Sequence, residues 1–236
     1  ARGLRPRKET SMATIGIRKY EITLTGKTAL LMHHDSLEWA DSMEAWKLNP
    51  KNKKYSKAGD DRTPAYRWIG CLYHDGRQVA MPQDNIMRCI MEGGALVLVP
   101  GGKMGKTFKA QTQSGIMCET PFLSFFTGGK EVQMTDIHPL MEEPDFKIHQ
   151  ETAEDLGFSL WAKRARIGRA KHVRVRPRFD SWSVVGTLVV LDKQITLDVL
   201  LDILETAGRL KGLGDWRPSS ATPGPFGTFE AAVREL

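Results

Sequence analysis

A run of basic residues in the second half of the chain carries the strongest chemical signal in the sequence. Residues 162–178 contain eight Lys or Arg side chains and no Asp or Glu. If the end of this run is a strand, residues two apart share a face, so Arg174, Arg176 and Arg178 form a row. A row of guanidinium groups can follow a phosphate backbone without reading its sequence. Charged residues also protect the edge of a sheet from aggregation, which is the structural alternative.

Aromatic neighbours favour nucleic acid over the structural alternative. Trp161 precedes the run and Phe179 follows it, and proteins that bind single strands combine cations with aromatic rings. Neutralising about five phosphates would give a single strand a log–log salt slope of roughly −3.5. The side chains of the run that we predict to hold phosphates are Lys163, Arg164, Arg166, Arg169, Lys171, Arg174, Arg176 and Arg178.

A glycine-rich stretch near the C-terminus is the second candidate. Residues 208–230 follow a helical pattern, carry Trp216 and Arg217 among glycines, and end in an alternating segment typical of a closing strand. Glycine permits positive φ and close backbone approach. Arg offers a fork for phosphate and Trp a stacking face for a base. The alternative is a helix-to-strand connection in which Trp216 fills the core.

A lysine-rich segment and one helical arginine complete the predicted binding residues. Residues 49–62 are polar and lack the periodicity of a packed element, so we expect a flexible loop or finger there. Arg88 lies on a helix that begins after Pro82 and would help to position the backbone. For Asp60 and Asp61, a solvated turn is favoured over a general base. The lysines of the segment predicted to hold phosphates are Lys51, Lys53 and Lys54.

Nucleotide hydrolysis and metal chemistry have less support. Residues 101–107 resemble a phosphate-binding loop, but the spacing from Gly101 to the Gly-Lys pair is one residue short. His33, His34 and Asp35 end a predicted strand, and a metal site there needs further ligands from elsewhere in the fold. The sequence therefore predicts no catalytic residue, no metal and no cofactor.

Composition limits the class of protein. The chain has 236 residues, a net charge of +6 and a pI near 9.2, which suits an anionic partner. Its three cysteines show no paired spacing, which is typical of a reducing compartment. No apolar run is long enough for a membrane span. We therefore expect a cytoplasmic protein without a membrane partner, with a basic N-terminal arm over residues 1–14.

The elements that must position these residues can be read from periodicity and turn residues. Short strands alternate with a few helices, which predicts an α+β sheet with helices on one face. We expect the acidic residues 136–155 to be irregular surface. The expected strands are 15–32 with a bend at Gly26, 95–99, 121–126, one beginning near 174, 182–191 and 226–230. The expected helices are 37–46 with Ser36 as its N-cap, one from Pro82 to Gly93, and one over 197–210.

Three segments, taken in order, resemble the Cas7-type branch of the RAMP superfamily, the RRM-like proteins of CRISPR effector complexes. Residues 22–26 resemble the opening strand of that family. Residues 79–88 resemble its short strand, proline, polar cap and helix, and residues 212–229 its glycine-rich C-terminal loop and strand. Residues 30–33 and 212–218 are also similar to small stand-alone proteins of phages and mobile elements. The resemblance as a whole extends over about half of the chain.

The resemblance implies a fold and an assembly. The fold is one RRM/ferredoxin-like antiparallel sheet over residues 15–236, with helices on one face and long inserted loops. The insertion at about 49–62 would be a finger and that at about 128–172 a thumb. Subunits would lie head-to-tail along a guide RNA, with other effector subunits and target nucleic acid as further candidate partners. Opposite charges on 136–155 and 162–178 would meet between neighbouring subunits.

The resemblance also bears on catalysis. Some family members cut target RNA with an acidic residue shortly before the strand that precedes the Pro-capped helix. Here that neighbourhood is Tyr66-Arg67-Trp68, so no nuclease activity is predicted. We therefore expect a non-catalytic, single-stranded nucleic-acid-binding subunit on CRISPR RNA. The first alternative is a stand-alone phage or mobile-element protein that coats or anneals single-stranded DNA, and the second is a metal-dependent nuclease using His33, His34, Asp35 and Asp61.

Overall fold

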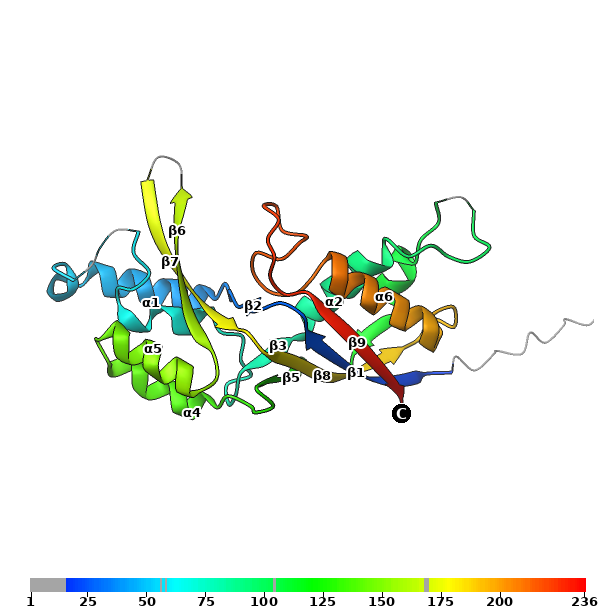
Figure 1. Ribbon diagram of the computed structural model, residues 1–236, viewed down its shortest axis with the longest axis horizontal. Coiled ribbons are helices and arrows are strands. Elements are labelled where there is room, and N and C mark those ends of the chain that lie inside the picture. The colour runs from blue at the N-terminus through cyan, green and yellow to red at the C-terminus, as the bar shows by residue number, and fades with distance from the viewer. Residues whose placement is uncertain (1–15, 56, 58, 104, 168–169) are drawn as a thin grey trace, which may run out of the picture.

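Two antiparallel sheets organise the computed structural model, which describes residues 16–55, 57, 59–103, 105–167 and 170–236 (Figure 1). The larger sheet has the strand order β3-β5-β8-β1-β9, and β4 also pairs with β8. Its strands are β1 (Arg18–Gly26), β3 (Ala80–Pro82), β4 (Ile116–Cys118), β5 (Phe122–Thr127), β8 (Trp182–Val190) and β9 (Phe229–Glu235). The mixed α+β class predicted from the sequence is confirmed.

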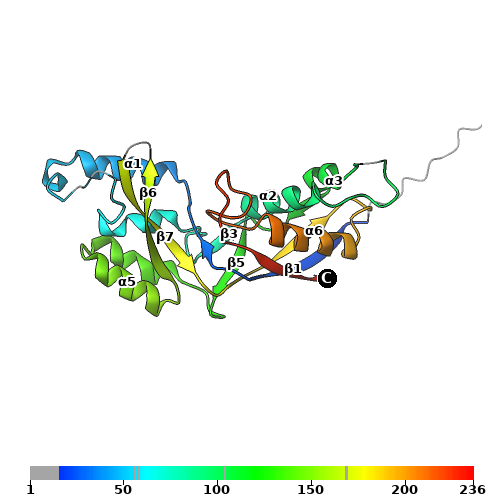
Figure 2. The same cartoon turned by 45° about the horizontal axis from the view of Figure 1, so that its top comes forward.

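Two helices cover one face of the larger sheet, as Figures 1 and 2 show. They are α2 (Gln83–Gly94) and α6 (Leu197–Leu210), with the short α3 (Lys109–Ser114) beside α2. Alternation along β1 buries Tyr20, Ile22 and Leu24 toward the core that these helices share. The two helices approach closely, because a Cβ on Gly93 would lie 2.7 Å from the Cβ of Ala207.

A smaller sheet and a second group of helices form the other half of the molecule. The sheet has the order β2-β7-β6, with β2 (Leu30–Leu31), β6 (Ser159–Ile167) and β7 (Ala170–Phe179). β6 and β7 form a long hairpin that rises on the same side of the molecule as the glycine-rich C-terminal loop (Figures 1 and 2). The helices of this half are α1 (Leu37–Leu48), α4 (Met134–Ile137), α5 (Phe146–Asp155) and the 3₁₀ helices η1 (Pro50–Asn52), η2 (Ala65–Cys71) and η3 (His138–Glu142).

One hydrophobic core runs through both halves. Phe125 of β5 meets Phe179 of β7 at a ring-centroid distance of 4.9 Å, and Phe179 meets Phe158 at 5.0 Å. Trp68 of η2 continues the series, 5.7 Å from Phe158. All four rings belong to the same buried cluster as β1 and β8. The hairpin is therefore held at its base by packing rather than by its own ladder alone.

Several local predictions are confirmed. The first strand breaks at Gly26 into β1 and β2. Ser36 caps α1, accepting a hydrogen bond from the Trp39 backbone N–H at 3.3 Å. Pro82 immediately precedes α2, and α6 covers the expected residues 197–210. Local signals of capping and periodicity were sufficient at these positions.

Several predictions are wrong, including the start of the closing strand, which is Phe229 rather than Phe226. Residues 95–99 are a turn after α2 with one isolated bridge, from Leu98 to Thr107, rather than a strand. Residues 136–155 form α4, η3 and α5, because Ile137, Leu140 and Ala153 are buried and anchor an otherwise acidic surface. Residues 60–61 are not a solvated turn, since Asp60 and Asp61 are buried.

The predicted arm over residues 1–14 lies outside the described residues. Within the described residues, no helix is both long and apolar enough to cross a bilayer.

Candidate nucleic-acid interface

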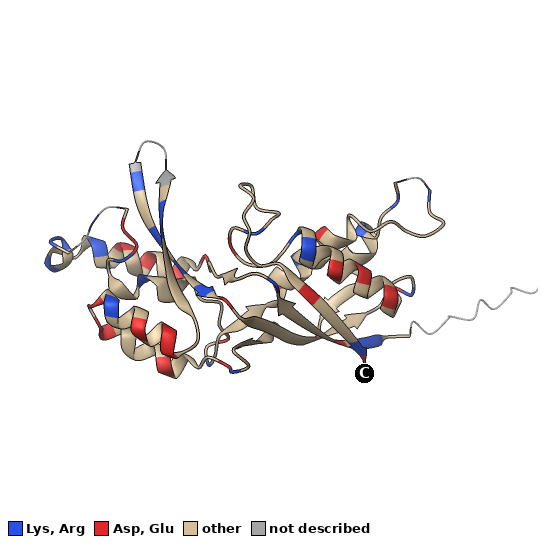
Figure 3. Ribbon diagram, in the orientation of Figure 1, with Lys and Arg blue, Asp and Glu red and all other residues tan. Residues whose placement is uncertain are grey.

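The β6–β7 hairpin aligns like charges across its ladder. Lys163 lies opposite Arg174, and Arg166 lies opposite Lys171 in the register. Like charges at directly opposed positions destabilise an antiparallel pair by up to about 1 kcal/mol. Residues 159–179 contain no Asp or Glu, so nothing within the two strands balances this charge (Figure 3). An anion laid along the hairpin would balance it.

Three cations of the hairpin are available for such an anion. Lys163, Arg164 and Lys171 are exposed and form no ion pair with any other described residue. Of the remaining predicted residues in this region, Arg169 and the side chain of Arg166 lie outside the described part of the structure. The available charge is therefore concentrated toward the outer end of the hairpin.

The arginine row of β7 lies on one face, as expected, but its guanidinium groups are already engaged. Arg174, Arg176 and Arg178 alternate with the buried Val175, Pro177 and Phe179. Each of the three also pairs with a carboxylate of the chain. The pairs are Arg174 Nη1 to Asp61 at 2.9 Å, Arg176 Nε to Asp215 at 3.1 Å and Arg178 Nη2 to Asp180 at 2.7 Å.

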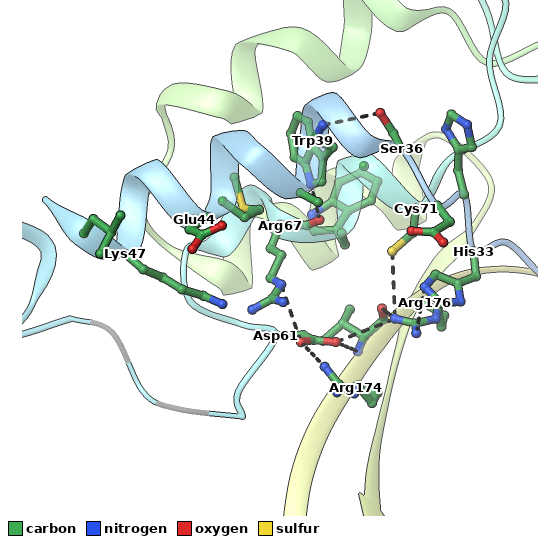
Figure 4. A pocket seen from close by; sticks show the side chains of 18 residues that line it. His33, Ser36, Trp39, Glu44, Lys47, Asp61, Arg67, Cys71, Arg174 and Arg176 are labelled. Atoms are coloured by element: carbon green, nitrogen blue, oxygen red, sulfur yellow. Dashed lines mark hydrogen bonds and ion pairs between the residues drawn. The ribbon is translucent and has the colours of Figure 1, made fainter. Parts of the chain in front are cut away.

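Asp61 is the centre of an ion-pair network beneath β7 (Figure 4). Its side chain is only 6% exposed. Besides Arg174, its carboxylate lies 3.5 Å from Arg67 Nε and 3.6 Å from Arg176 Nη1. Its backbone N–H donates to the Val173 carbonyl at 3.0 Å. The end of the lysine-rich segment is therefore fastened to β7, which corrects the prediction of an unpacked loop at this end.

This network forms the floor of a cavity of about 610 Å³ between α1, η2 and β7. His33 and Cys71 also line it, and Arg176 Nη2 lies 3.3 Å from His33 Nε2. Burial lowers the pKa of His33, and the Arg176 charge lowers it further, so the imidazole is neutral at pH 7. Among the described residues no group of three or more His, Cys, Asp or Glu has the arrangement to hold a metal ion.

The glycine-rich loop 211–228 is fixed against β2 by backbone hydrogen bonds. Asp215 N–H donates to the Leu31 carbonyl at 2.8 Å, and Gly227 N–H to the Ala29 carbonyl at 2.8 Å. Gly214 has φ +76°, and a Cβ there would lie 2.3 Å from the Leu31 oxygen. Glycine is therefore required for close packing within the chain at this position.

Aromatic side chains from this loop and from the hairpin meet outside the core. Trp216 and Phe226 of the loop lie 5.8 Å and 5.4 Å from Trp161 of β6, measured between ring centroids. The three rings are partly exposed and do not belong to the buried cluster. Trp216 is therefore not a core residue, and its second predicted role, stacking on a base, remains a prediction.

Arg88 and Arg217 converge on one carboxylate. Arg88 Nε donates to Glu92 Oε1 at 3.0 Å, and Arg217 Nη2 lies 3.5 Å from the same oxygen. Burial alone would raise the pKa of Glu92, but hydrogen bonds from Arg88 and Ser219 and the charge of Arg217 outweigh it and lower the pKa. The two arginines predicted to position a nucleic-acid backbone thus lie together, and Arg88 remains exposed.

The lysine-rich segment stands apart from these groups. Lys51 lies in η1, and Lys53 and Lys54 follow it; all three are exposed. Lys54 Nζ lies 4.7 Å from the Tyr55 ring centroid. In Figure 1 the segment that follows α1 lies at the opposite end of that helix from β2.

Sequence reasoning missed the carboxylates that organise the arginines. Asp61 and Arg174 are separated by 113 positions, and Arg176 and Asp215 by 39. No local periodicity reports pairing over such distances. It also missed Phe226, because this residue was assigned to the alternating pattern of the closing strand. A phenylalanine in the same glycine-rich loop as a tryptophan was the signal that could have identified an aromatic cluster.

Comparison with known proteins adds no assignment. No protein-family model matches the chain, and no curated protein is significantly similar to it. Any function must therefore be argued from the residues and their geometry.

Proposed function

We propose that this chain is a non-catalytic, single-stranded nucleic-acid-binding subunit, a Cas7-like backbone protein that assembles head-to-tail along a CRISPR guide RNA. The observation that carries the proposal is the β6–β7 hairpin. It presents exposed cations without carboxylate partners among the described residues, and aromatic rings lie at its base. Cations beside stacking faces are the combination that binds single strands without sequence preference.

The order of elements supports the RRM-like part of the proposal. In the strand order β9-β1-β8-β5, the first strand β1 lies between the last strand β9 and β8, and β5 lies on the other side of β8. Helix α2 comes between β1 and β5 in sequence, and α6 between β8 and β9. A β-α-β-β-α-β series with two helices on one face of an antiparallel sheet is the ferredoxin-like arrangement.

The insertions support the thumb and finger of the proposal. Residues 128–181 lie between β5 and β8 and contain α4, α5 and the hairpin, a longer insertion than the 128–172 expected. Residues 49–62 follow α1 and are anchored at their end by Asp61. A projecting basic hairpin suits a thumb that contacts a strand bound to the neighbouring subunit. The acidic helix α5 instead packs against β6 of the same chain.

Equilibrium binding tests the proposal. Fluorescence anisotropy would compare a single-stranded 20-nucleotide RNA, the DNA of the same sequence and the DNA duplex, over a series of salt concentrations. The double variant Arg164→Gln/Lys171→Gln removes two available cations, so the log–log salt slope for a single strand should fall in magnitude by about 1.4. The matched control is Lys103→Gln/Lys106→Gln, which removes two exposed lysines from another loop.

The outcomes distinguish the proposals. Tighter binding of both single strands than of the duplex, with a slope reduced only by the hairpin variant, supports the proposal. Preference for the duplex, or an equal loss in the control, contradicts it. A strong preference for DNA over RNA would favour the stand-alone single-stranded DNA binder. Cleavage of the strand in magnesium, abolished by His33→Ala, would favour the nuclease.

A further inference from the structure

The cluster formed by Trp161, Trp216 and Phe226 is an unusual use of aromatic surface. The third centroid distance, between Trp216 and Phe226, is 5.6 Å, so every ring contacts the other two. The cluster joins β6 to the glycine-rich loop, yet its rings stay partly exposed. Partly exposed aromatic rings are enriched at interfaces and serve as stacking faces for the bases of single strands. The cluster is therefore a candidate ligand site.

The backbone at Trp216 supports that inference. Trp216 is the only described non-glycine residue with positive φ, at +48°. A residue with a Cβ is strained in this region, and such strain concentrates at binding sites. The surrounding contacts fix it: Trp216 N–H donates to its neighbour Asp215 Oδ1 at 2.9 Å, and a Cβ on Gly224 would lie 2.1 Å from the Trp216 oxygen. The backbone of Trp216 is therefore held in place before any ligand binds.

A lysine occupies the open face of this ring. Lys163 Nζ lies 3.5 Å from the Trp216 ring centroid and 5.5 Å from that of Trp161. It is exposed and has no carboxylate partner among the described residues. A cation–π contact at an exposed site is weak. The ammonium can therefore leave the ring when a better partner arrives.

We infer that Trp216, supported by Trp161 and Phe226, is a stacking site for a base of a bound single strand, and that Lys163 is its displaceable cover. A base that stacks on Trp216 replaces the ammonium, which then contacts the phosphate of that nucleotide. Stacking and charge are thereby coupled at one position of the strand. This inference rests on the proposed function and specifies where it contacts a base rather than the backbone.

An abasic strand separates stacking from charge. The full-length protein would be titrated with a single-stranded oligonucleotide and with one of the same length whose nucleotides lack bases, at equal salt. Removing a stacked base should weaken binding by roughly 5- to 150-fold. Trp216→Leu keeps an apolar side chain at the same strained position and removes the stacking face, so the difference between the two strands should disappear. Phe226→Leu, a second variant, should reduce it.

Two further variants complete the test. Lys163→Gln should keep the preference for the strand with bases but reduce the magnitude of the salt slope by about 0.7, because one phosphate contact is lost. Phe122→Leu, which removes an exposed aromatic ring from β5, should change neither quantity. Thermal unfolding of each variant confirms that it is folded. Quenching of tryptophan fluorescence by the strand, absent in Trp216→Leu, provides an independent readout.

The failure of this inference differs from failure of the proposed function. If the wild-type protein binds both strands equally tightly, or if Trp216→Leu retains the full preference for bases, the stacking site is wrong and phosphate binding stands. If the protein binds neither strand at low salt, both are wrong.

Discussion

Replacement of Asp61 tests whether the network beneath β7 is structural. In Asp61→Asn the side chain keeps its shape but loses its charge, leaving Arg67, Arg174 and Arg176 close together without their shared carboxylate. Breaking a buried pair by removing one partner costs about 3–5 kcal/mol. The arginine side chains are 25%, 31% and 13% exposed, so water screens part of the repulsion, and we expect roughly 3 kcal/mol.

Urea denaturation measures this loss as a change in the free energy of unfolding. For a chain of this size 3 kcal/mol corresponds to a fall in Tm of roughly 6–12 °C. The matched control is Asp180→Asn, which breaks the Arg178 pair at a carboxylate that is 66% exposed and should cost less than about 1 kcal/mol.

Asp61→Asn should lower stability but should not weaken the binding of single-stranded nucleic acid. The arginines that Asp61 releases can contact phosphate, so Asp61→Asn should bind a single strand at least as tightly as the wild type, with a steeper salt slope. Equal stability of Asp61→Asn and wild type would refute the structural role. Loss of a strand-cleaving activity on the same substitution would refute the non-catalytic reading.

Three other substitutions or treatments have defined outcomes. Gly214→Ala should destabilise the fold by at least 1 kcal/mol more than Gly101→Ala in chemical denaturation, because both glycines have positive φ but only Gly214 lies against a neighbouring carbonyl; equal losses would contradict this. His149→Phe should lower the free energy of unfolding by about 1–3 kcal/mol. The fully buried imidazole accepts from an indole N–H at 3.0 Å and lies 2.9 Å from a backbone carbonyl, and both groups would lose their hydrogen-bond partner. An unchanged urea midpoint would contradict this. Burial raises the pKa of Cys89 to about 12 and that of Cys118 to about 11, so both thiols should react slowly with iodoacetamide at pH 8. Mass spectrometry should find both unmodified until denaturant is added. Rapid labelling of either thiol in the native protein would contradict this.

Local rules account for the part of the fold that the sequence predicted. Ser36 and Pro82 mark helix starts through capping and a missing N–H, and apolar spacing marks α2 and α6. These signals act within a few residues, so no tertiary information is needed. The charge run was equally visible, because eight cations without an acid stand out in any window.

Long-range pairing accounts for the part that the sequence could not predict. The acidic stretch 136–155 contains few apolar residues, and its helices exist because Ile137, Leu140 and Ala153 pack into a core supplied by other elements. Asp61 looked like a solvated turn residue, and only the fold brings the arginines of β7 to it. The same holds for the aromatic cluster, in which Trp161 of β6 meets two rings of the distant glycine-rich loop.

The nucleic acid that stays bound to the protein tests the central claim most directly. The chain would be purified from cells that carry its native locus, washed at high salt, and its bound nucleic acid extracted and sequenced. The account predicts a discrete RNA with repeat-derived ends, whose length divided by the site size of one subunit gives the number of subunits. Heterogeneous DNA, or no nucleic acid, would contradict the guide-backbone proposal.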